Sequence, residues 1–191
     1  MMQQKIFSSI LIFFLSISLS FAQEKKKELV QWMSFDKAVE AAKKDTNKMM
    51  LIDIYTVWCT PCEMMSERTL NHPKVAKIIN EKFYPVKFNA EGNAKIQFLG
   101  QLYENKGYQE ELARSRNAVH PFTYFIAQTN RGIAYPTISF LSYDGKEKHP
   151  VQGVIPAQDF ALLLHYVSGK YYQKNIDFQD FKVKYKDQID F

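Results

Sequence analysis

Trp58-Cys59-Thr60-Pro61-Cys62 is the stretch that decides the fold, and it holds the only two cysteines among the 191 residues. It follows directly on the apolar run 49–55, which predicts a buried strand, and it opens a predicted helix. Three-residue spacing at a helix start lets two sulfurs come within bonding range. The helix dipole and the unpaired N–H groups there favour the thiolate form, which attacks disulfides. The stretch therefore predicts a dithiol/disulfide redox centre.

Two other interpretations of the cysteine pair are an inert structural disulfide and half of a metal site. A disulfide that closes so short a loop restrains the unfolded chain little, and an exported domain that relied on disulfides would carry several. A zinc site needs about four ligands. The histidines are scattered along the chain, at His72, His120, His149 and His165. Reactivity explains the pair better, so we predict no metal and no cofactor other than the Cys59–Cys62 disulfide.

The first 22 residues are typical of a secretory signal peptide. A short, weakly positive start precedes the apolar run 6–21, and small residues stand at Ser20 and Ala22, before the expected cleavage point. The run is short for a membrane span, although an uncleaved anchor is the alternative. We therefore predict an exported protein, periplasmic or otherwise extracytoplasmic.

Residues 23–191 have the length of a single domain with its own core. The formal net charge is +5, and a cluster of three lysines at 25–27 supplies much of the excess. We interpret this cluster as a solvated leader. No basic stripe with interleaved aromatic residues follows it, which argues against nucleic-acid binding.

Apolar periodicity predicts alternating helices and strands along the chain. We expect strands at 49–55, 83–89, 138–141 and 148–152, and helices at 32–44 (with Ser34 as the N-cap), 59–70, from Pro73, 156–169 and 177–186. The less regular stretch 91–132 shows no strand signal, and we expect helices there at 96–103, 110–118 and 122–128. This order predicts an α/β protein with a mixed sheet and helices on both faces.

With this order of elements, the chain resembles the thioredoxin superfamily over about residues 32–169. The matching features are the Trp-Cys-x-Pro-Cys motif, Asp53 six positions before Cys59, Lys87 and Asn89 in the next strand, Pro136-Thr137 before a hairpin, and Gly153. The run 69–76 is similar to the exported branch that includes the C-terminal domain of the transmembrane thiol reductant transporter. The departures are a helical insert at about 93–129, before the cis-proline strand, and a C-terminal helical extension at about 170–191.

The resemblance implies catalytic roles for four residues. Cys59, the more exposed thiol, attacks a substrate disulfide, and Cys62 resolves the mixed disulfide. Asp53 helps to deprotonate Cys62 through a water molecule, with Lys87 as its partner. A core polar pair without catalytic weight is the alternative for Asp53 and Lys87.

The resemblance also implies a substrate groove beside the thiols. Pro136 follows a cis peptide bond in a loop that faces the cysteines, so Tyr135 stands at the groove, and Trp58 flanks the thiols as an apolar platform or as a packing residue. Thr60, Pro61 and Glu63 are expected to tune the redox potential.

Together these features predict a thiol–disulfide oxidoreductase that reduces or exchanges disulfides of other exported proteins. A reducing enzyme of this kind needs a membrane-bound thiol donor, and an oxidising one needs an acceptor. Two alternatives stay open. One is a protein-thiol oxidant. The other is a binding module, in which the insert and the aromatic tail form a docking surface and the dithiol acts as a redox switch.

Overall fold

The computed structural model describes residues 28–189 and 191. The predicted signal peptide, residues 1–22, lies outside this described part. Within the described part, no helix is both long and apolar enough to cross a membrane.

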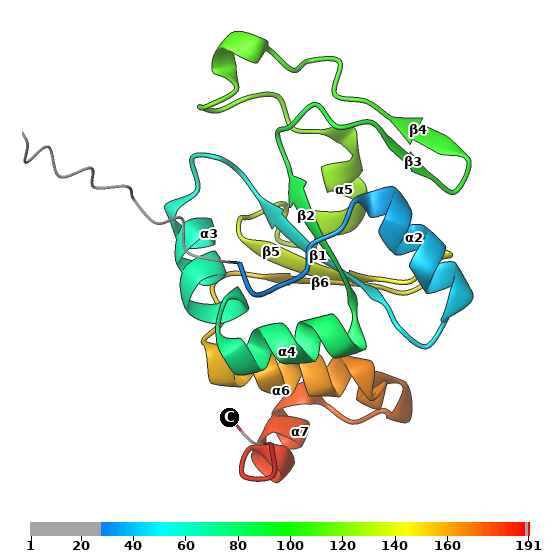
Figure 1. Ribbon diagram of the computed structural model, residues 1–191, viewed down its shortest axis with the longest axis vertical. Coiled ribbons are helices and arrows are strands. Elements are labelled where there is room, and N and C mark those ends of the chain that lie inside the picture. The colour runs from blue at the N-terminus through cyan, green and yellow to red at the C-terminus, as the bar shows by residue number, and fades with distance from the viewer. Residues whose placement is uncertain (1–27, 190) are drawn as a thin grey trace, which may run out of the picture.

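A four-stranded mixed sheet forms the centre of the molecule (Figure 1). Its strands are β1 (Met50–Tyr55), β2 (Tyr84–Asn89), β5 (Thr137–Leu141) and β6 (Lys148–Gln152), in the spatial order β2-β1-β5-β6. β1 pairs with β2 in parallel and with β5 antiparallel, and β5 pairs with β6 antiparallel. All four strands lie where the sequence predicted them. The mixed α/β fold with helices on both faces is confirmed.

Helices cover both faces of the sheet. On one face, α4 (Pro73–Lys82) and α6 (Ala157–Ser168) bury their apolar side chains against the sheet in one core. On the other face, α2 (Phe35–Lys44) and α5 (Pro121–Ala127) form a second core with the opposite side of the same strands. Because β1 is covered on both faces, its residues are almost all buried, and a polar residue within it must serve a purpose or find a partner.

The helix after the cysteine motif is continuous from α3 (Thr60–Met65) into a π-helical segment, η1 (Ser66–Leu70). It ends where the sequence predicted, just before Pro73, which opens α4. The Thr69 hydroxyl donates a 2.6 Å hydrogen bond to the Ile155 carbonyl oxygen, so the far end of this helix is tied to the segment before α6. The helix that carries the cysteines is therefore held at both ends.

The insert differs from the predicted helices. Residues 96–103 form a hairpin of β3 (Ile96–Phe98) and β4 (Gln101–Tyr103), not a helix. Leu99 and Gly100, with φ of 51° and 80°, make the turn, and two consecutive positive φ values suit a two-residue hairpin loop. Ile96 and Phe98 are buried while Gln97 is exposed, a period of two that the apparent helical spacing concealed.

The predicted helix at 110–118 is also wrong, apart from one 3-10 turn, η2 (Glu110–Leu112). Side-chain hydrogen bonds hold this loop instead, because the Asn117 amide bonds both the N–H and the carbonyl oxygen of Gln109. The third predicted helix, 122–128, is confirmed as α5. The insert thus consists mostly of a hairpin and a loop held by side-chain hydrogen bonds, rather than of helices.

The C-terminal extension packs on the outside of α6. It consists of η3 (Tyr171–Lys174) and α7 (Phe178–Tyr185), and the helix predicted at 177–186 is confirmed. Phe178 and the buried Phe181 of α7 each meet the Tyr166 ring of α6 edge to face. Aromatic packing therefore anchors the extension to the helix beneath it.

Candidate redox site

The cysteine motif sits at the junction between β1 and α3. Cys59 is the N-cap of α3, and the Cys62 N–H donates to the Cys59 sulfur at 3.2 Å. The N–H groups of Cys62 and Glu63 also bond the Cys59 carbonyl oxygen, at 3.0 and 3.2 Å. Cys59 and Cys62 are joined by a disulfide. Pro61 fits in the first turn because no intrahelical donor is needed there.

The two cysteines are buried to the same extent, which corrects one expectation. Cys59 is 6% exposed and Cys62 is 7% exposed, so Cys59 is not the more accessible residue of the oxidised pair. What distinguishes Cys59 is its place at the helix start, where its sulfur already accepts an N–H hydrogen bond. That bond would stabilise a thiolate on Cys59 in the reduced protein.

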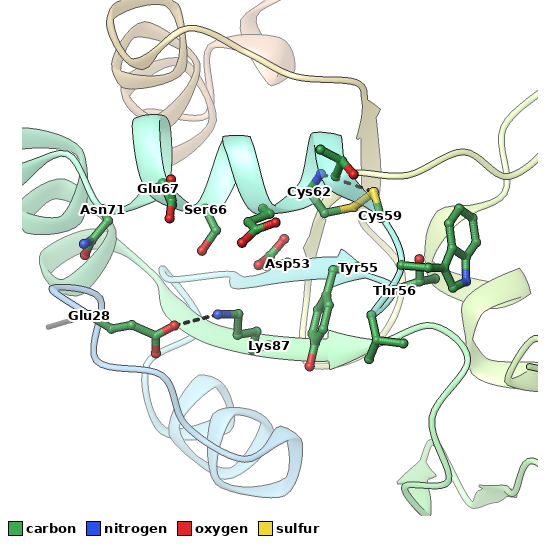
Figure 2. A pocket seen from close by; sticks show the side chains of 14 residues that line it. Glu28, Asp53, Tyr55, Thr56, Cys59, Cys62, Ser66, Glu67, Asn71 and Lys87 are labelled. Atoms are coloured by element: carbon green, nitrogen blue, oxygen red, sulfur yellow. Dashed lines mark hydrogen bonds and ion pairs between the residues drawn. A yellow bond between two sulfur atoms is a disulfide. The ribbon is translucent and has the colours of Figure 1, made fainter. Parts of the chain in front are cut away.

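A cavity of about 550 Å³ lies beside the disulfide. Figure 2 shows that its walls come from the start of the described chain, from β1 and β2, and from α3 and η1. Both cysteines line it, as do four acidic residues, Glu28, Asp53, Glu63 and Glu67. Among its lining residues Lys87 is the single cation. The cavity therefore places several carboxylates on one side of the disulfide.

Asp53 and Lys87 are neighbours, but they do not form the expected pair. Their backbones lie opposite one another in the β1–β2 register. Within the described residues no ion pair joins their side chains, because the Lys87 ammonium contacts Glu28 at 2.6 Å instead. It also lies 5.5 Å from the Trp32 ring centroid and 5.8 Å from that of Tyr55. The partner expected for Asp53 is thus already engaged elsewhere.

The environment of Asp53 favours its protonated form. The residue is 4% exposed, and burial raises the pKa of its carboxyl group from 3.8 to about 7. The charge of Lys87 lowers this pKa and that of Glu28 raises it, but both effects are smaller than burial. Asp53 lines the same cavity as Cys62, and a carboxyl group that titrates near neutral pH can both accept and release a proton there.

Trp58 forms an aromatic wall next to Cys59. Its indole N–H donates to Glu91 at 2.8 Å, and its ring meets the Tyr135 ring edge to face, with centroids 6.0 Å apart. The guanidinium carbon of Arg116, which belongs to the insert, lies 3.7 Å from the Trp58 ring centroid. Trp58 is therefore held by specific contacts and does not merely fill space.

The expected cis peptide bond between Tyr135 and Pro136 is present. Pro136 is buried and its carbonyl oxygen accepts a hydrogen bond from Gly153, while Tyr135 is partly exposed beside Trp58. Burial, followed by the charge of Glu91, raises the pKa of the Tyr135 hydroxyl to about 12. That hydroxyl has no hydrogen-bond partner among the described residues. Tyr135 rather than Pro136 is thus the side chain that a substrate could reach.

The three residues expected to tune the disulfide, Thr60, Pro61 and Glu63, are all exposed on the first turn of α3. Thr60 and Glu63 line the cavity. A carboxylate at this place opposes thiolate formation, whereas the helix dipole favours it. The structure thus places the three residues around the disulfide, and their effect on its potential stays a prediction.

Three residues of the site were missed by sequence reasoning: Glu28, Glu91 and Arg116. Glu91 is 7% exposed and follows β2 by two residues, continuing the alternation of Lys87 and Asn89, so its spacing was a usable signal. Glu28 and Arg116 come from irregular segments that carry no such signal. Across residues 28–189 and 191, no group of three or more His, Cys, Asp or Glu residues could hold a metal ion.

Residues 16–180 match the model of a protein family described as "Thioredox_DsbH: Protein of unknown function, DUF255". No curated protein sequence matches the chain. A thioredoxin-fold protein from Helicobacter pylori is structurally similar, with a TM-score of 0.53 and 19% identity over 76% of this chain and 88% of that protein. This similarity confirms the expected thioredoxin-like fold.

Two further solved structures are similar at lower TM-scores. A protein described as DsbH oxidoreductase has a TM-score of 0.44 and 19% identity, covering 66% of this chain and 74% of its own. The oxidised C-terminal domain of DsbD from Neisseria meningitidis has a TM-score of 0.41 and 20% identity, covering 74% of this chain and 91% of its own.

Proposed function

Since the chain belongs to the thioredoxin-like DsbH family, we propose that it is an exported thiol–disulfide oxidoreductase that reduces or exchanges disulfides of other proteins. The observation that carries the proposal is the Cys59–Cys62 disulfide at the start of α3, next to a cavity that Asp53 also lines. A disulfide kept only for stability needs neither the helix start nor a titrating neighbour.

The reaction follows thiol–disulfide exchange in two steps. In the reduced protein, the Cys59 thiolate attacks one sulfur of the substrate disulfide, and the other substrate sulfur leaves as a thiolate that takes up a proton. The Cys62 sulfur then attacks Cys59, closes the Cys59–Cys62 disulfide and releases the second substrate thiol. The cysteine pair thereby gives two electrons to the substrate. Because Cys59 reacts as a thiolate, the pair loses only the Cys62 proton, and the second proton that the substrate takes up comes from the solvent.

For the second step we propose Asp53 as the acceptor of the Cys62 proton. It lines the cavity together with Cys62, and its pKa of about 7 suits a proton acceptor at neutral pH. The ammonium of Lys87 is held by Glu28, so Asp53 carries this role without a direct ion pair.

A new catalytic cycle requires a donor of two electrons, for which we propose a membrane-bound dithiol protein. The direction of the reaction can be measured by equilibrating the protein with glutathione. A potential near that of thioredoxin, about −270 mV, supports a reductant, and one near −120 mV supports the alternative role as a protein-thiol oxidant.

The test of the activity itself is insulin reduction in the presence of dithiothreitol. The wild-type protein should accelerate it, and Cys59→Ser should abolish the acceleration. If both proteins behave alike, the proposed activity is wrong.

The separate roles of the two cysteines can be tested by trapping. Cys62→Ser should accumulate mixed disulfides through Cys59, because the resolving step is lost. Cys59→Ser should accumulate none. The reverse pattern would exchange the attacking and resolving roles.

A further inference from the structure

The insert returns to the redox motif at Arg116. The guanidinium group of this exposed residue stacks on the Trp58 ring, with 3.7 Å between its carbon and the ring centroid, and Trp58 directly precedes Cys59. A cation from a distant part of the chain is thereby placed on the side chain that precedes Cys59, and it is not among the residues that line the acidic cavity.

Glu91 holds both the ring on which Arg116 stacks and the backbone next to Arg116. One carboxylate oxygen, Oε2, accepts the Trp58 indole N–H at 2.8 Å and the backbone N–H of Asn117 at 2.9 Å. Asn117 is the next residue after Arg116, so the same buried carboxylate anchors the stacked ring and the backbone that carries the arginine. An arginine held in this way loses little conformational entropy when it binds a partner.

The donors of Arg116 are free to bind such a partner. Stacking uses the face of the guanidinium plane and leaves its N–H edge open, which is the edge that binds a carboxylate in bidentate fashion. Within residues 28–189 and 191, no carboxylate lies within ion-pair distance of Arg116. The acidic residues Asp53, Glu63 and Glu67 line the cavity, and the cation of that cavity, Lys87, is already paired with Glu28. Arg116 at the Trp58 ring is a cation near the motif without such a partner among the described residues.

We propose that Arg116 is a specificity-determining residue that favours protein segments with an aspartate or glutamate next to the reactive disulfide. The inference rests on the proposed function, because it concerns the partner of the same cysteines. It goes further in naming the chemistry of that partner, a carboxylate bound at the Trp58 wall.

The test measures the rate constants with which the reduced protein reacts with three disulfide peptides that differ only in an Asp, Ala or Lys beside one cysteine. Each rate is divided by that of the same peptide with dithiothreitol, which removes the intrinsic effect of the charge on the disulfide. We expect the Asp peptide to react about three-fold to ten-fold faster than the Lys peptide at low ionic strength. The ratio should fall towards one in about 1 M salt.

Arg114 provides a matched control, because it is exposed in the same loop and has neither an ion pair nor a ring contact among the described residues. Arg116→Gln should lose most of the Asp-over-Lys preference, and Arg114→Gln, with the same change in net charge, should keep it. Arg116→Lys should restore only part of it, because an ammonium cannot bind bidentately.

The outcomes separate the two proposals. Equal rates for all three peptides, or an equal loss of preference in both glutamine variants, would overturn the role of Arg116 and leave the oxidoreductase proposal intact. No reaction with any peptide or with insulin would overturn the proposed function itself.

Discussion

The two sides of the disulfide differ in how they use charge. The cavity side holds four carboxylates, Glu28, Asp53, Glu63 and Glu67, with Lys87 already bound to Glu28. The aromatic side begins at Trp58, which also borders the cavity, and continues with Tyr135. A buried acid, Glu91, accepts the Trp58 N–H, and a cation, Arg116, lies over the Trp58 ring.

The difference indicates a division of tasks between the two sides. On the cavity side a carboxyl group is buried without an ion-pair partner, which raises its pKa and suits it to move protons. On the aromatic side the Glu91 carboxylate accepts hydrogen bonds from the Trp58 indole N–H and the Asn117 N–H. It thereby positions Trp58 and the backbone next to Arg116, so this side suits the binding of a partner.

The largest expected effect is on the cavity side, where Asp53 should make stability depend on pH. Its pKa is 3.8 in the unfolded chain and about 7 in the fold, so the folded state binds more protons between these values. The free energy of unfolding should therefore fall as the pH rises from about 4 to 7, by up to about 4 kcal/mol.

Asp53→Asn should remove most of this dependence and leave a protein that is more stable at pH 8 than the wild type. The measurement is urea unfolding of the oxidised protein across this pH range. Identical pH profiles for the two proteins would show that Asp53 is not the titrating group. In the insulin assay the variant should be slower, since its amide cannot accept the Cys62 proton.

The next effect concerns the aromatic side. Glu91→Ala leaves the Trp58 indole N–H and the Asn117 N–H without their acceptor, and we expect a loss of about 2–4 kcal/mol in unfolding free energy. Glu91→Gln removes the same charge but keeps an oxygen acceptor, so it should lose clearly less. Equal losses in denaturant unfolding would mean that the charge, and not the two hydrogen bonds, is what matters.

The smallest effect is expected at Glu28. Its negative charge raises the pKa of Asp53, and its carboxylate holds Lys87, so Glu28→Gln should lower the pKa of Asp53. Because Asp53 must be deprotonated to accept the Cys62 proton, insulin reduction should rise with pH as Asp53 titrates, and in Glu28→Gln this rise should shift to lower pH. Glu67→Gln removes a carboxylate from the same cavity without touching Lys87, and it should shift the profile less. An equal shift in both variants would point to the general charge of the cavity.

Most of the central fold could be predicted from local patterns. The apolar run of β1, the helix start at Cys59 and the glycine and proline punctuation are all local, and the sheet follows from their order. The insert could not be predicted in this way. A helical period fits Ile96, Leu99, Leu102 and Tyr103. The segment forms a strand instead, because the strand period lets the side chains of Ile96 and Phe98 both pack into the core formed with α2 and α5.

The candidate site divides along the same line. Cys59, Cys62, Asp53 and the cis bond before Pro136 were predicted, because a short motif and its spacing identify them. Lys87 was expected as the partner of Asp53. It lies opposite Asp53 and its charge lowers the pKa of that carboxyl group, but its ammonium is bound to Glu28, 59 residues earlier in the chain. A local sequence pattern cannot predict that a carboxylate from another segment binds the lysine.

By itself, the sequence determined the candidate redox pair of this protein, since two cysteines three residues apart at a helix start form a dithiol/disulfide couple from local geometry alone. Only the tertiary structure decided what surrounds them. It brought Glu28 to Lys87, Glu91 to Trp58 and Arg116 to the Trp58 ring, contacts between residues far apart in the chain. The physical reason is that charges and rings act through space, so their partners are set by packing and not by spacing along the sequence.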